Sequence, residues 1–128
     1  ESGQFEISSF VLGAFDAPHE AILSDETPQN TAYLVDGNIL HPGDSLSKNL
    51  YGLKHTPILC LPMMAPWTTE LQVYEFALGM LPKNIIPIHD GFAKDFFLES
   101  RYRNFQGRFS QSNINFQWMS EAGDYFEF

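Results

Sequence analysis

Two short apolar runs, separated by a stretch with helical periodicity, restrict the fold of this chain more than any other feature. Residues 56–61 and residues 84–89 are apolar at most positions, and prolines or an Asp-Gly pair bound them. Such runs are typical of central strands, which are apolar on both sides because both faces of their sheet are covered. The sequence therefore predicts a strand–helix–strand unit at the centre of a sheet.

Two helices are expected on either side of the second run. The first begins at Thr68 or Thr69, either of which can cap a helix, and ends before Pro82. Its apolar positions recur at helical spacing, at Leu71, Tyr74, Ala77 or Leu78, and Leu81. Residues 92–109 form the second amphipathic pattern.

Further strands are expected before and after this unit. Residues 5–15 alternate partly and predict one strand, and residues 32–35 and 39–41 predict a hairpin around Asp36-Gly37. Residues 114–118 and 125–128 predict two closing strands. The expected fold class is α/β (α+β), with one mixed sheet and two helices on one face, in a single domain over residues 1–128.

Charge and cysteine content exclude several classes of protein. The net charge of -9 would repel a phosphate backbone, so no nucleic-acid partner is expected. No apolar run reaches the ~20 residues of a membrane span, and no signal-peptide pattern is seen. Cys60 is the only cysteine and lies in an apolar run, which predicts a buried, inert thiol. We expect a cytoplasmic protein with no membrane partner.

Polar residues with metal-binding chemistry stand near the ends of the predicted strands. They are His19, His41, Asp44 and His89. Ligands that follow neighbouring parallel strands converge on one edge of a sheet, and imidazole with carboxylate suits zinc, iron or manganese. A lone histidine is more often an ordinary core or surface residue. The residue types and spacing alone leave both interpretations open.

Three segments, in the same order, resemble the metallo-β-lactamase fold of metal-dependent hydrolases. Residues 31–45 contain an apolar hairpin followed by His-Pro-Gly-Asp, residues 61–67 read Leu-Pro-Met-Met-Ala-Pro-Trp, and residues 86–91 read Ile-Pro-Ile-His-Asp-Gly. The resemblance runs from about His19 to the C-terminus and is strongest to the ascorbate-lactonase-like branch. It implies that this chain supplies the C-terminal half of an αββα sandwich.

The resemblance also implies roles for individual residues. Asp44 matches the carboxylate that bridges two metals, His89 matches a ligand of the second metal, and His19 matches a ligand of the first. His41 would support Asp44 or pack under the site, and Asp90 would support the ligands or be only a turn residue. No residue is assigned a catalytic role. The implied cofactor is a divalent metal, with zinc as the first expectation and manganese or iron as alternatives.

The His-x-His-x-Asp-His motif, which supplies most ligands in that family, has no match in this sequence. We therefore expect partial or absent metal occupancy, and no robust hydrolysis by the chain alone. The uncovered sheet face predicts a homodimer through that face, or a missing N-terminal half supplied separately. A monomer whose own ends fold over the face is the weaker alternative. Three functions stay open: an inactive fragment of a hydrolase, a split hydrolase completed by a partner chain, and a non-catalytic binding module.

Overall fold

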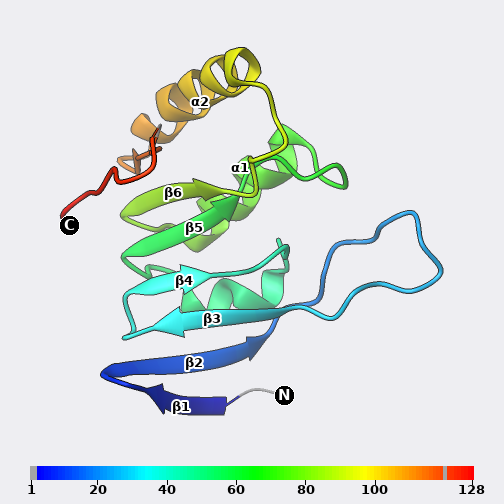
Figure 1. Ribbon diagram of the computed structural model, residues 1–128, viewed down its shortest axis with the longest axis vertical. Coiled ribbons are helices and arrows are strands. Elements are labelled where there is room, and N and C mark those ends of the chain that lie inside the picture. Colours follow the sequence, from blue (N-terminus) through cyan, green and yellow to red (C-terminus); the bar gives the residue numbers. More distant parts are fainter. Residues whose placement is uncertain (1–2, 120) are drawn as a thin grey trace.

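The computed structural model describes residues 3–119 and 121–128 as a seven-stranded sheet with two α-helices (Figure 1). The strands are β1 Gly3–Ile7, β2 Phe10–Asp16, β3 Thr31–Val35, β4 Ile39–His41, β5 Ile58–Pro62, β6 Asn84–Ile88 and β7 Asn115–Phe116. The helices are α1 Glu70–Met80, α2 Asp95–Ser110 and the short 3-10 helix η1 Lys48–Leu53. The strands lie in chain order across the sheet, antiparallel from β1 to β4 and parallel from β4 to β7. The predicted mixed α/β sheet is confirmed.

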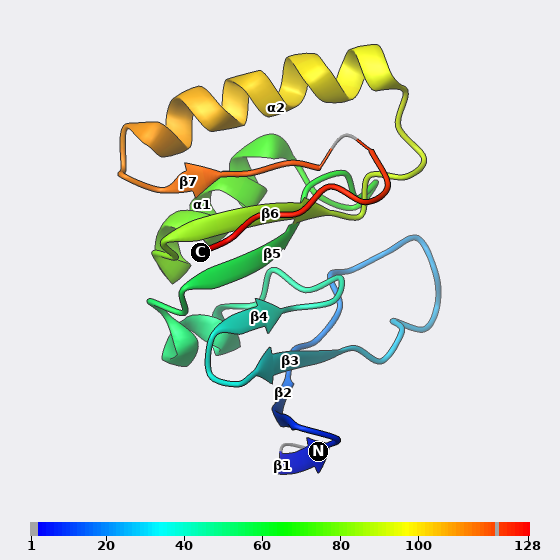
Figure 2. The same ribbon diagram turned by 60° about the vertical axis from the view of Figure 1, so that its left-hand side comes forward.

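Both helices pack on the same face of the sheet, as Figure 2 shows for α2 above β7 and α1 behind β6. Leu59, Ile85 and Phe116 are neighbours across β5, β6 and β7, and all three are buried. The ring of Phe109 from α2 stacks on Phe116 with 5.8 Å between centroids. Tyr74 from α1 contacts Phe109 at 5.3 Å, so the two helices share one aromatic core.

The opposite face of the sheet is apolar and is called the open face below. Strand register places many apolar side chains on it, among them Phe5, Ile7, Phe10, Leu12, Tyr33, Val35, Ile39, Ile58, Cys60, Ile86 and Ile88. Phe5, Ile7, Phe10 and Tyr33 are between 40% and 53% exposed. A contiguous exposed apolar patch of this kind is unusual on a soluble monomer.

The two ends of the chain differ from the sequence prediction. Residues 5–15 form a hairpin rather than one strand, because Ser8 adopts a positive φ of 55° and turns the chain. The resulting β1 extends the sheet beside β2 and does not cover the open face. Residues 125–128 form no strand and are exposed. Figure 2 shows the C-terminal segment passing in front of β6, on the side away from α1.

Helix α1 begins where predicted, and the predicted positions Tyr74 and Ala77 lie in or against the core, but two other predicted positions do not. Thr69 caps it through a reciprocal pair of hydrogen bonds, a capping box. The predicted core residues Leu71 and Leu81 are 62% and 46% exposed, while Val73 and Met80 are buried. Apolar residues surround this helix, so periodicity does not single out the face that packs. In the described part of the chain, no helix is long and apolar enough to cross a membrane.

Cys60 lies on the open face in the middle of the sheet. It is half-buried and forms no disulfide. Burial raises the pKa of its thiol, because a low-dielectric surrounding disfavours the charged thiolate. The thiol is therefore less reactive than a free cysteine, although it is less deeply buried than the sequence predicted.

Candidate functional site

Four loops meet at one edge of the sheet because the strands before them run in the same direction. Strand β2 is antiparallel to β3, which is antiparallel to β4, and β4, β5 and β6 are parallel. The C-terminal ends of β2, β4, β5 and β6 therefore share an edge. The loops that follow them carry His19, Asp44, Trp67 and His89 in that order.

The carboxylate of Asp44 lies between two imidazoles. Its Oδ2 is 3.5 Å from Nε2 of His19, and its Oδ1 is 3.5 Å from Nε2 of His89. The side chain of His19 is 5% exposed, that of His89 27% and that of Asp44 38%, so solvent reaches the centre from the Asp44 side. The structure thus brings together the three residues that the sequence predicts as metal ligands.

The orientation of His19 leaves one ring nitrogen facing Asp44. Nδ1 of His19 lies 2.6 Å from the backbone oxygen of Glu20. A carbonyl oxygen only accepts hydrogen bonds, so Nδ1 carries the proton. In the neutral ring, Nε2 then presents a lone pair toward the Asp44 oxygen. Two lone pairs at this distance repel each other unless a proton or a cation lies between them, and metal-binding histidines commonly donate their other N–H to a carbonyl in this way.

Aromatic rings hold His89 from two sides. The ring of Trp67 meets His89 edge-on with 5.2 Å between centroids, and Phe92 meets it edge-on at 5.8 Å. Trp67 also contacts His19 at 4.6 Å and so lies against both imidazoles. His89 has a positive φ of 64°, which aims its side chain back from the end of β6 toward Asp44. Its Nδ1 is buried and has no hydrogen-bond partner among the described residues.

Asn30 joins the loop after β2 to the loop after β4, and sequence reasoning missed it. Its Nδ2 donates to the backbone oxygens of Ala17 at 2.7 Å and Pro42 at 2.9 Å. Its Oδ1 accepts a hydrogen bond of 3.1 Å from the backbone N–H of Asp44. Gly43 has a φ of +64°, and a Cβ at this position would collide with Oδ1 of Asn30. The glycine of the His-Pro-Gly-Asp motif thus allows Asn30 to hold Asp44.

Two more polar side chains connect the same loops. The hydroxyl of Ser45, which is fully buried, donates to the backbone oxygen of Pro18 at 2.7 Å. The carboxylate of Glu20 accepts a hydrogen bond of 3.1 Å from the backbone N–H of Leu46. These contacts place the chain on either side of His19 and Asp44. They are made by common polar residue types in loops, so no sequence pattern could have identified them.

His41 and Asp90, predicted to support the ligands, contact other groups. Nδ1 of His41 accepts a hydrogen bond of 3.2 Å from the backbone N–H of Gly43, so it touches the turn before Asp44 rather than the carboxylate. Asp90 accepts a hydrogen bond of 2.5 Å from the hydroxyl of Tyr102 on α2. Burial and this hydrogen bond to Asp90 raise the pKa of Tyr102. Asp90 therefore ties the turn after His89 to the helix layer.

The donor atoms suit a divalent cation in kind but not in number. Imidazole nitrogen and carboxylate oxygen are the usual ligands of zinc, and His19 already donates its outer N–H to a carbonyl. Each oxygen of Asp44 has one imidazole beside it, which makes two pairs of donors rather than one set. Over residues 3–119 and 121–128, no group of three or more His, Cys, Asp or Glu side chains is arranged to hold a metal ion.

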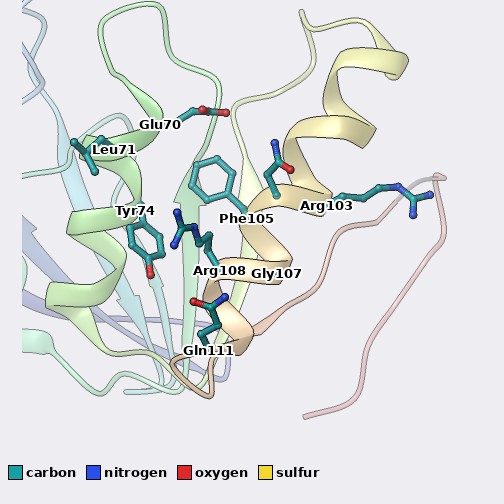
Figure 3. Close-up of a pocket in the computed structure, with 9 residues that line it drawn as sticks. Glu70, Leu71, Tyr74, Arg103, Phe105, Gly107, Arg108 and Gln111 are labelled. Carbon is teal, nitrogen blue, oxygen red and sulfur yellow. The ribbon is translucent and has the colours of Figure 1, made fainter.

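A groove of about 720 Å³ lies elsewhere, between α1 and α2 (Figure 3). Its walls include Tyr74 and Phe105, and Arg108 points into it from α2. None of the three converging residues lines this groove. We therefore do not place the functional site in this groove.

Comparison with solved structures identifies the fold. A protein from Parabacteroides distasonis assigned as a metal-dependent hydrolase is 21% identical, with a TM-score of 0.60 over 91% of this chain and 54% of its own. A metallo hydrolase from the hyperthermophilic archaeon Ignicoccus hospitalis is 18% identical, with a TM-score of 0.65 over 98% of this chain and 58% of its own. The chain thus has the fold of part of these metallo-hydrolases and spans little more than half their length. No protein-family model and no curated protein matches it.

Proposed function

We propose that this chain carries part of the metal centre of a metal-dependent hydrolase, and that further ligands come from outside it. The observation that carries the proposal is the carboxylate of Asp44 between Nε2 of His19 and Nε2 of His89. A structural ion pair would need one imidazole, whereas this carboxylate has one on each oxygen. The similarity of fold to metallo-hydrolases supports the same assignment.

The roles of the three residues follow from their positions. His19 and His89 would each bind through Nε2, and Asp44 would bind through one oxygen on each side. A bound divalent ion would supply an activated water and polarise the bond to be cleaved, which suits hydrolysis of an ester or a lactone. Trp67 fixes the orientation of both imidazoles by packing against them. We propose zinc as the natural metal, with manganese or iron as alternatives.

The missing ligands require a second body of protein. The two metallo-hydrolases that share this fold extend well beyond the region that this chain matches. The open face of the sheet offers an apolar surface on which such a body could pack. We propose that a separate N-terminal α/β half supplies these ligands, and that a second copy of this chain covers the open face when that half is absent. We also propose that the protein is located in the cytoplasm.

Zinc titration followed by NMR of the histidine rings tests the partial site. We expect the ring signals of His19 and His89 to shift on addition of zinc, because both contribute a nitrogen. His55 is exposed and serves as the internal control whose signals stay in place. The substitution Asp44→Asn should raise the dissociation constant for zinc, read from these shifts, at least about tenfold, because it removes a charged ligand.

The metal-loaded chain alone should turn over simple esters and lactones no faster than free zinc does, since too few ligands hold the ion. Equal zinc-induced shifts at His55, His19 and His89 would show only surface binding and would sink the proposed site. Substantial turnover that Asp44→Ala abolishes would instead show that the site is complete in this chain or its dimer.

A further inference from the structure

The loops around the candidate site present aromatic side chains next to His89. Trp67 comes from the loop after β5, and Phe92 comes from the loop after β6. Both rings meet the imidazole edge-on, at interplanar angles of 79° and 81°. The ring of Phe92 is in contact with His89 and yet 65% exposed. Most of its apolar surface therefore faces the solvent beside the site.

The exposed ring of Phe92 is not an isolated case in this segment. Phe96 and Phe97, at the start of α2, are 74% and 46% exposed. Leaving three phenylalanines in six residues in water forgoes favourable burial of apolar surface. A ligand with an apolar group would recover that burial at Phe92, the ring that touches the site.

The side chains around the site provide little positive charge of their own. In the described part of the chain, the carboxylate of Asp44 lies 3.5 Å from Nε2 of each of the two histidines, and no lysine or arginine is paired with it. Arg101 reaches the backbone oxygen of Met63 near this edge, at 3.3 Å, but it is also paired with Glu70 at 3.5 Å. The whole chain carries a net charge of -9. Among residues 3–119 and 121–128, no lysine or arginine is paired with Asp44, so these side chains provide no counterion at Asp44 for a phosphate or carboxylate.

We propose that the substrate carries an alkyl or aryl group that packs against Phe92 and Trp67, with its hydrolysable bond toward Asp44. This inference rests on the proposed function and names its substrate class: a neutral ester or lactone with an apolar group. The rings of Phe92 and Trp67 determine which substrates bind, whereas His19, His89 and Asp44 would hold the metal next to the bond to be cleaved. Longer alkyl groups bury more of the Phe92 ring and bind more tightly.

A series of methyl esters tests the substrate class on the metal-free chain. Methyl acetate, methyl butanoate and methyl hexanoate are titrated while the phenylalanine and tryptophan ring signals are followed by NMR. The expected result is a dissociation constant that falls about fourfold for each added methylene, until the group outgrows the wall. Intermolecular NOEs should join the hexanoate chain to the Phe92 ring, which needs no variant.

Two matched variants complete the experiment. Phe92→Ala should remove the dependence on chain length, while Phe128→Ala should retain it, because Phe128 is 59% exposed and lies at the far end of the chain. Equal affinity for all three esters, or absence of NOEs to Phe92, would overturn the inference. The zinc titration is read separately at the histidines, so failure of the metal site and failure of the substrate class give different results.

Discussion

Gly43 and Asn30 show how one residue pair controls the position of Asp44. We expect Gly43→Ala to lower the free energy of unfolding by at least about 2 kcal/mol, through a positive φ and a collision with Oδ1 of Asn30. Gly37→Ala is the matched control, since Gly37 has a φ of +69° but open space at its Cβ, and should cost only about 1 kcal/mol. Urea unfolding measures both.

A double-mutant cycle separates strain from collision. Adding Asn30→Ala to Gly43→Ala should recover part of the loss, because the alanine methyl then has room. Equal costs for the two glycine substitutions would contradict the proposed role of Asn30. So would strict additivity of the Asn30 and Gly43 substitutions.

The sequence could predict the site residues whose motifs are distinctive. Asp44 and His89 stand in short patterns after apolar strands, and His19 follows the first strand region, so their convergence could be anticipated. Asn30 could not, because an asparagine in a polar loop fits many turns equally well. Its three hydrogen bonds depend on two loops that meet only once the sheet has formed.

At the scale of the element, the packed side of α1 gives a direct test. Met80 is 1% exposed and Leu71 is 62% exposed. We expect Met80→Ala to cost about 2–5 kcal/mol through the cavity it leaves, and Leu71→Ala to cost less than about 1 kcal/mol. Thermal or urea unfolding of both variants provides the comparison. A larger loss for Leu71→Ala would mean that the helix packs on the side that the periodicity favoured.

Some strand and helix boundaries could be predicted from local sequence patterns, and others could not. The hairpin at residues 36–37 and the capped start of α1 were predicted because Asp-Gly and Thr at these positions have specific backbone consequences. The turn at Ser8 was missed, because Ser-Ser carries no such signal and only its positive φ identifies it. Residues 125–128 alternate like a strand but form none in the described structure.

At the scale of the whole molecule, the open face predicts self-association. Purified chain at micromolar concentration should scatter light with twice the 14.6 kDa mass of one copy. Association should strengthen as salt is raised, because each copy carries a net charge of -9 and salt screens their repulsion. Phe10→Asp, on the open face, should shift the population to monomers. Phe96→Asp is the control, with the same change of charge on α2.

Two outcomes would contradict this assembly. One is a clean monomer at all salt concentrations, which would leave the open face without a partner in solution. The other is an equal effect of the Phe10 and Phe96 substitutions, which would move the interface or show a general effect of charge.

The position of Cys60 has a practical consequence. The only thiol of the chain lies in the middle of the open face, where anything that packs against the sheet must cover it. Its rate of alkylation therefore reports whether that face is covered. The thiol is alkylated slowly when another protein surface covers the face and faster when the face is exposed. Because burial raises the pKa of this thiol, little thiolate is present at neutral pH, and the rate of alkylation increases as the pH is raised and more thiolate forms. Mass spectrometry of the alkylated chain can then follow occupancy in mixtures where light scattering fails.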